Sequence, residues 1–169
     1  PAQSAPHMDT AKLLQVYEKS RRRWRETMMV SQLEGIMREA MEEGSGAESV
    51  DKAHVAGLGS LSCGGENGWR SMWQLVMFLD VITEEKKNRT IKMYAQDPAF
   101  NDIDEAFLAK LGIETSDIDI PPSATPAASA HLITPSTFFF APCMPWALLW
   151  PQYLHNKDRE PALFIGNDV

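Results

Sequence analysis

Short apolar strands alternate with helical segments through the last two thirds of this 169-residue chain, and this alternation limits the possible folds more than any other feature. Parallel strands need long crossover connections, usually helices, so the order is typical of a parallel sheet with helices on its faces. Right-handed crossovers leave few topologies. We therefore predict a three-layer, Rossmann-like α/β sandwich of about five mostly parallel strands. The expected strands are residues 53–58, 90–95, 113–120, 137–141 and 162–166, and the expected helices are residues 69–82, 101–112 and 146–155.

The segment before this alternation, residues 10–42, carries apolar side chains at helical spacing with no proline between them. We expect one continuous helix there, followed by a short linker of glycine and serine. The chain then divides into an N-terminal helical extension, residues 1–50, and an α/β domain, residues 51–169. The extension, with Trp24 and several methionines, either packs on that domain or contacts a partner.

The charge of the chain limits its partners. A formal net charge of −7 argues against general nucleic-acid binding, which needs Lys and Arg to neutralise phosphates. Residues 21–25 hold four arginines and are the local exception. We interpret them as the solvated face of a helix, with a nuclear-localisation or phosphate-binding patch as the alternative. No segment reaches the roughly 18 apolar residues of a membrane span, so no membrane partner is expected.

The cysteine count and the first residues bear on the compartment. Only two cysteines occur, and a chain of this length needs no disulfide framework. Reduced thiols in a cytoplasmic or nuclear protein are the simplest interpretation. The first ten residues lack the charged-then-apolar layout of a secretion signal. The chain starts with Pro1 instead of methionine, which suggests a fragment or processed chain with upstream targeting signals out of view.

Three unusual loops, residues 57–65, 96–98 and 141–145, follow predicted strands. In open parallel sheets, ligands bind beyond the carboxyl ends of the strands, where the strand order reverses. In a 3-2-1-4-5 strand order these three loops would line one crevice. The candidate ligand-binding residues on them are Gly57, Gly59, Ser60, Ser62, Asp97 and Cys143.

The glycine turn and Asp97 each allow two interpretations. Glycines let backbone N–H groups approach a phosphate at a helix N-terminus. Here the third glycine of the dinucleotide pattern is absent and Glu66 would repel an anion, so a tight strand-to-helix turn is the simpler reading. Asp97 occupies the place of an acid that binds a ribose hydroxyl. However, it follows Gly59 by 38 residues, farther than usual, and Asp97-Pro98 is also a common turn.

No catalytic residue and no metal site is predicted. A nucleophilic Cys143 would need a base within hydrogen-bond reach, and no motif supplies one, so we expect a structural or incidental thiol. The four histidines are scattered without ligand spacing, and His54 is expected to be a strand residue. Trp146, Trp150 and Tyr153 either pack on the sheet or form an aromatic wall for a ligand or partner.

Several short motifs follow one another at sensible spacings: Gly57-Leu58-Gly59-Ser60, Trp73-Gln74-Leu75, Asp97-Pro98-Ala99-Phe100 with Asp104, Leu108-Ala109-Lys110-Leu111-Gly112, the apolar strand into Pro142 and Pro145, and Ile165-Gly166-Asn167. In these motifs the chain resembles the Sensitivity to Red Light Reduced-like (SRR-like) family over about residues 51–168. The resemblance implies a regulatory protein, because that family is associated with circadian and light-signalling control in plants and related regulation in other eukaryotes.

The chain departs from the family pattern after the fourth strand. The family usually shows Pro-His-Cys-Pro there, whereas this chain has Pro142-Cys143-Met144-Pro145. A metal-binding, haem-binding or proton-transfer role that depends on the family's His–Cys pair is therefore not expected for this chain.

Three functional hypotheses fit these residues. The first is a non-catalytic regulatory or interaction domain of the SRR-like family with a protein partner and a small ligand in the crevice, its cofactor unknown. The second is a methyltransferase-like or nucleotide-dependent enzyme that uses the glycine turn and Asp97. The third is a redox or metal sensor, which needs Cys63 and Cys143 close together.

Overall fold

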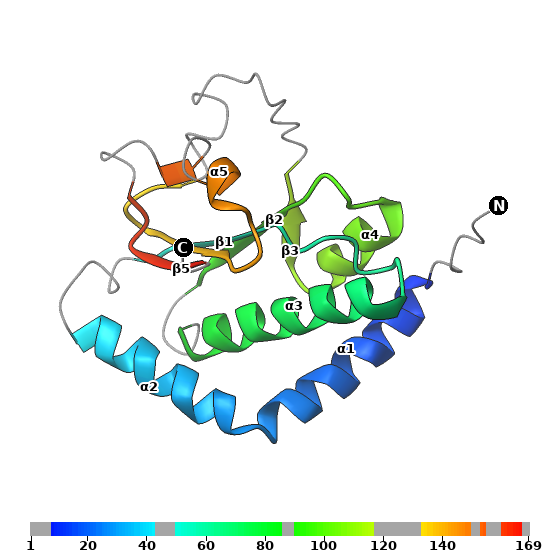
Figure 1. The fold of residues 1–169 in the computed structure, drawn as a ribbon, viewed down its shortest axis with the longest axis horizontal. Helices are drawn as coiled ribbons and strands as arrows, with labels where there is room; N and C mark the ends of the chain where they lie inside the picture. The colour runs from blue at the N-terminus through cyan, green and yellow to red at the C-terminus, as the bar shows by residue number, and fades with distance from the viewer. Residues whose placement is uncertain are drawn as a thin grey trace.

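Five parallel strands form one sheet in the order β3-β2-β1-β4-β5, which confirms the predicted α/β fold class (Figure 1). The structure, a computed structural model, describes residues 8–42, 50–85, 90–116, 133–149, 153–154 and 160–166. The strands are β1 (Lys52–Ala56), β2 (Lys92–Gln96), β3 (Ile113–Thr115), β4 (Thr137–Ala141) and β5 (Leu163–Gly166). The helices are α1 (Thr10–Arg25), α2 (Met28–Glu42), α3 (Gly65–Glu85), α4 (Asp102–Lys110) and α5 (Trp146–Leu149).

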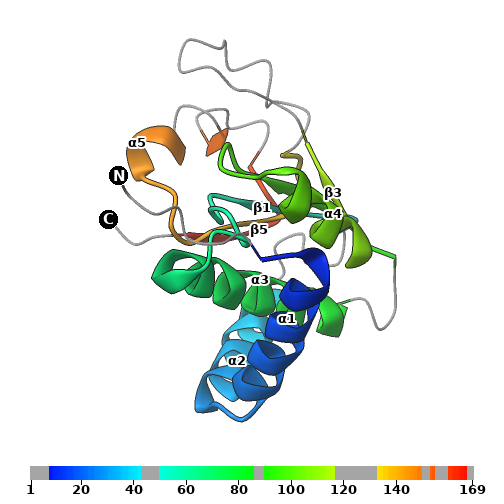
Figure 2. The same cartoon turned by 90° about the vertical axis from the view of Figure 1, so that its right-hand side faces the viewer.

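The helices lie on both faces of the sheet. Helices α3 and α4 cover one face, the short helix α5 lies on the opposite face, and α1 and α2 form an outer layer against α3 (Figures 1 and 2). Because α3 lies between the sheet and this outer layer, most of its surface is covered. This explains the nearly continuous run of apolar residues in α3.

The side chains of strand β4 pack into two hydrophobic cores, one on each face of the sheet. Its residues are all buried, and successive side chains point to opposite faces. Phe138 and Phe140 contact Phe78 of α3 with ring centroids 6.0 and 5.8 Å apart, whereas Phe139 stacks on Phe164 under α5. A central parallel strand buried on both faces is expected to be a continuous apolar run, which is why this strand was predicted with its observed bounds.

The prediction of a single helix over residues 10–42 is wrong, because the chain turns between α1 and α2. The Thr27 hydroxyl donates a 2.7 Å hydrogen bond to the Trp24 carbonyl, and the Glu26 amide donates to the carbonyls of Arg23 and Trp24. These bonds satisfy the last carbonyls of α1 and end the helix. Neither glycine nor proline marks the turn, so helical spacing alone did not reveal it.

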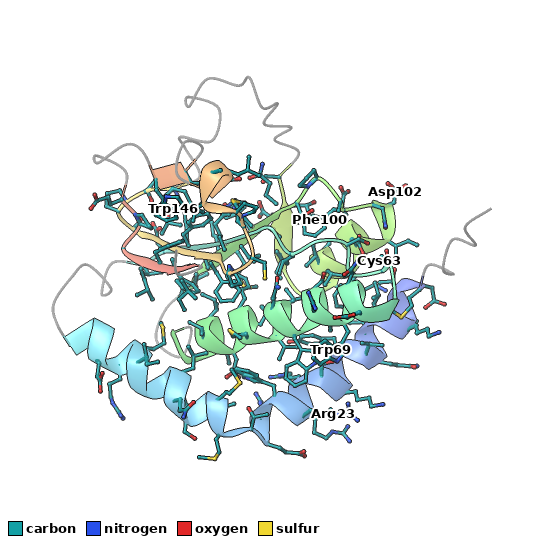
Figure 3. All side chains as sticks on the ribbon, in the orientation of Figure 1. Arg23, Cys63, Trp69, Phe100, Asp102 and Trp146 are labelled. Carbon is teal, nitrogen blue, oxygen red and sulfur yellow. The ribbon has the colours of Figure 1, made fainter. Side chains whose placement is uncertain are left out.

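Helix α1 packs on the α/β domain. The Trp24 side chain is 2% exposed, its indole Nε1 donates to Asp80 Oδ2 at 2.9 Å, and its ring meets Trp73 edge to face. In the middle of the helix, Tyr17 packs against Phe107 of α4. The arginines of this helix lie mainly on its outer side, and Arg23 points away from the layers (Figure 3). This agrees with a solvated helix face.

Most other differences from prediction concern the ends of elements. Helix α3 begins four residues before the expected start, and β3 ends at Thr115. The structure does not describe the end of the strand expected over 113–120, part of the helix expected over 146–155, or most of residues 121–136, whose Pro, Ala, Ser and Thr content predicts a loop. Helix α2 leaves Met28, Met29 and Ile36 exposed.

Candidate functional site

The carboxyl ends of β1, β2, β3 and β4 border a cavity of about 990 Å³. Binding sites for small molecules usually measure about 300–1,000 Å³, so this cavity could hold a cofactor-sized ligand. Of the candidate residues, Gly57, Gly59, Ser60, Asp97 and Cys143 line it. The structure therefore brings the three predicted loops to one crevice.

The cavity lies where the strand order reverses, between the loop after β1 and the loop after β4. These two loops touch at Gly57, where an added Cβ would lie 3.4 Å from the Met144 Cβ. Gly57 also has a φ of 76°, a conformation that favours glycine. Glycine is therefore favoured at this position by its backbone conformation, since an added Cβ would make only an ordinary contact with Met144.

Asp97 ties the β1 and β2 loops together. Its Oδ2 accepts a 2.8 Å hydrogen bond from the Gly59 amide, and its Oδ1 accepts one of the same length from the Ala99 amide. A carboxylate has about four acceptor positions, so these two bonds leave acceptor capacity for a ligand. Asp97 therefore holds the β1 and β2 loops together and is also a polar group on the cavity wall.

Three amide groups of the glycine turn donate hydrogen bonds within the protein. Gly57 donates to the Gln96 carbonyl at 3.3 Å, Gly59 donates to Asp97, and Ser62 donates to Asp104 Oδ1 at 2.8 Å. A dinucleotide-binding turn would instead offer such donors to the pyrophosphate. The geometry supports the simpler reading of this turn as a tight strand-to-helix connection.

Ser62 is the one candidate residue that does not line the cavity. Its side chain is fully buried, and its hydroxyl accepts a 2.9 Å hydrogen bond from Asn101 Nδ2. Asn101 in turn caps α4 in a capping box, in which the Asp104 carboxylate accepts from the backbone amide of Asn101. Ser62 therefore fastens the glycine turn to the start of α4.

Replacing Asn101 with alanine is expected to lower the free energy of unfolding by about 1–2 kcal/mol, because the cap of α4 is lost together with the bond to Ser62. Urea denaturation measures this change. Asp102→Asn, at an exposed position in the same helical turn, is the control and should stay within about 0.5 kcal/mol of the parent. An equal effect of the two substitutions would contradict the capping role.

Sequence reasoning left the role of Tyr153 open and assigned none to Gln96. The Tyr153 hydroxyl donates a 2.9 Å hydrogen bond to Gln96 Oε1, and both residues line the cavity. Burial, together with the nearby Asp97 carboxylate, raises the pKa of Tyr153 to about 12. Its ring lies 5.0 Å from Phe139, so this residue both packs on the sheet and forms part of the cavity wall. Trp150 lies outside the described residues.

Sequence reasoning also missed Phe100, Arg70 and Glu105 on the wall. Phe100 and Cys63 lie on the side of the molecule where α3 and α4 begin (Figure 3). Arg70 is mostly exposed and forms a 2.5 Å ion pair with Glu66 one helical turn earlier. Only the general rule that loops after parallel strands line a site could have pointed to Phe100.

Both cysteines are free thiols that line the cavity. The Cys63 thiol donates to the Ser60 carbonyl, and the exposed Cys143 sulfur accepts from Gln74 Nε2. Within the described ranges, neither thiol has a His, Asp or Glu hydrogen-bond partner, and no three metal-ligating side chains gather. The described part of this site therefore offers binding groups, without an activated nucleophile.

His54 is a buried strand residue, as expected, and does not line the cavity. It lies on the α5 side of β1, between Phe139 and Tyr153, with ring centroids 5.7 and 6.4 Å away. Neither ring nitrogen has a hydrogen-bond partner among the residues the structure describes. Burial lowers the pKa of His54 to about 4, so the ring is neutral at physiological pH.

Together, these features define an open parallel α/β domain with a ligand-sized cavity at the reversal of strand order. Residues 29–169 match the family described as the SRR1 domain, and the chain belongs to this family. The match begins within α2, earlier than the start near residue 51 expected from the motifs. No curated protein and no solved structure matches the chain significantly. None of the helices in the described ranges is long and apolar enough to cross a membrane.

Proposed function

We propose that this SRR1-family chain is a non-catalytic regulatory domain that binds a small molecule in the strand-end cavity. A protein partner in the cytoplasm or nucleus would respond to the occupied state, as in circadian or signalling control. The observation that carries the proposal is the cavity of about 990 Å³ at the reversal of strand order. Fold alone does not define function, so the proposal depends on this site.

The polar groups of the cavity favour binding over catalysis. Asp97 is held by two backbone amides, and Tyr153, whose pKa is raised to about 12, is protonated at neutral pH as any tyrosine would be. The Cys143 sulfur has an amide neighbour, Gln74, instead of a base. A general base needs a pKa near the working pH, and the pKa of Tyr153 lies far above it.

A ligand that binds the native cavity should raise the thermal stability of the protein. At a concentration one hundredfold above Kd, the gain is about 2.7 kcal/mol, which corresponds to roughly 5–10 °C for a domain of this size. The measurement is a thermal-shift series with S-adenosylmethionine, NAD, adenosine, ATP and haem. We expect a shift from at least one of these compounds.

A matched pair of substitutions locates the binding. Ala99 is an exposed residue on the cavity wall, and Ala109 is an exposed residue of α4 away from it. Ala99→Trp should fill the cavity and abolish the shift, whereas Ala109→Trp should retain it. A shift that persists in Ala99→Trp, or no shift with any compound, would overturn the proposed function.

A further inference from the structure

The charges around the cavity disfavour a ligand rich in phosphate. Two carboxylates, Asp97 and Glu105, lie on its wall, and the cation on the wall, Arg70, is already paired with Glu66. The described charged residues of the wall therefore sum to about one negative charge, within a chain whose formal charge is −7. Bringing a triphosphate here would place like charges together.

Several hydrogen bonds of the glycine turn also disfavour a phosphate. Three amide groups of the glycine turn, those of Gly57, Gly59 and Ser62, donate to acceptors of the protein and are therefore not free for a phosphate. A phosphate could recruit them only by breaking bonds that hold the β1 loop to the β2 loop and to α4. A phosphate-binding turn has its donors free and pointing at the ligand.

The cavity wall offers a hydrogen-bond acceptor, Asp97, beside the flat apolar surfaces of Phe100 and Pro98. Asp97 keeps unused acceptor positions after its two backbone bonds, and a carboxylate that accepts from two neighbouring hydroxyls is a recurrent way to hold a sugar diol. Phe100 and Pro98 follow on the same loop and also line the cavity. An aromatic ring and a proline ring next to that carboxylate suit a planar base attached to the sugar.

We propose that the cavity binds an unphosphorylated nucleoside, whose sugar diol donates to Asp97 and whose base lies against Phe100. This inference rests on the proposed small-molecule function and narrows its ligand class. It makes Asp97 a binding residue through its remaining acceptor capacity, while its two backbone bonds keep the loops in place.

The test is calorimetric titration of the full chain with adenosine, uridine, 2′-deoxyadenosine and ATP. At least one of the two ribonucleosides should bind. If adenosine is the one that binds, 2′-deoxyadenosine should bind about ten- to a hundredfold more weakly, because hydrogen bonds to a charged group are among the stronger ones. ATP should also bind at least about tenfold more weakly than adenosine. Equal affinity for adenosine and 2′-deoxyadenosine, or tighter binding of ATP, would overturn the inference.

Two isosteric substitutions on the cavity wall complete the experiment. Asp97→Asn, which also gives up one of the two backbone bonds, should weaken binding of the ribonucleoside by about ten- to a hundredfold and should bring its affinity to within about threefold of that of the 2′-deoxynucleoside; Glu105→Gln removes the same charge from the wall and should change both affinities less than about threefold. Equal effects would show that charge alone matters and would contradict the diol contact. If neither nucleoside binds while another compound gives a shift that Ala99→Trp abolishes, the nucleoside inference fails and the proposed function stands.

Discussion

Replacing Trp24 with alanine should lower the free energy of unfolding by about 3–5 kcal/mol, a large part of the stability of a typical domain. The side chain is 2% exposed and fills the contact between α1 and α3. Its removal leaves a cavity and also removes the 2.9 Å hydrogen bond to Asp80. The effect is informative because Trp24 precedes the range matched by the SRR1 family, yet it belongs to the main core.

Urea denaturation of the full chain measures this effect. Arg23→Ala is the matched control, because Arg23 is the preceding residue of the same helix and is exposed. That control should change the free energy of unfolding by less than about 0.5 kcal/mol. A loss below about 1 kcal/mol for Trp24→Ala would mean that α1 is an appendage instead of part of the folded unit.

The second large effect is a loss of stability in acid that originates at His54. Its pKa is about 4 in the folded protein, below the value of about 6.5 expected when the chain is unfolded. Between these two pH values the unfolded chain binds a proton that the folded chain does not, so stability falls as the pH falls. The contribution of His54 is intact above about pH 6.5 and is lost by about pH 4. The total loss is about 3 kcal/mol, because one pKa unit corresponds to about 1.4 kcal/mol.

The variant His54→Leu isolates this contribution. Leucine has a similar volume, does not titrate, and removes two buried nitrogens without partners among the described residues. Other titrating groups affect both proteins alike, so the difference in unfolding free energy between variant and parent should grow by about 2 kcal/mol from pH 7 to pH 4.5. Urea denaturation at several pH values measures it. A difference that stays constant with pH would contradict a neutral, buried His54.

The fold could be predicted where the pattern reports directly on burial. The run at Thr137–Ala141 is apolar throughout because the strand is covered on both faces, and this identifies a central parallel strand. The ends of the helix expected over residues 101–112 lie close to the observed ends of α4, because its cap, Asn101, and the positive φ after it, at Gly112, have characteristic residues. The turn at Glu26–Thr27 carries no such residue, and it arises because α2 packs beside α3 instead of continuing α1.

The site could be predicted only to the level of its loops. Topology places the ends of β1, β2 and β4 together, and the structure does bring Gly57, Asp97 and Cys143 to one cavity. Which groups face the cavity depends on contacts between residues far apart in sequence. The Gly59–Asp97 bond spans 38 positions, and the Tyr153–Gln96 bond spans 57. Spacing within a motif carries no information about such partners.

Amide chemical-shift mapping by NMR tests most directly whether this cavity is the ligand site. The uniformly ¹⁵N-labelled full chain would be titrated with each compound of the thermal-shift series. At least one compound should move the resonances of Gly59, Ala99 and Met144 together, one from each loop that borders the cavity. If no compound moves all three, or if the changes are confined to α1 and α2, the strand-end cavity is not the binding site.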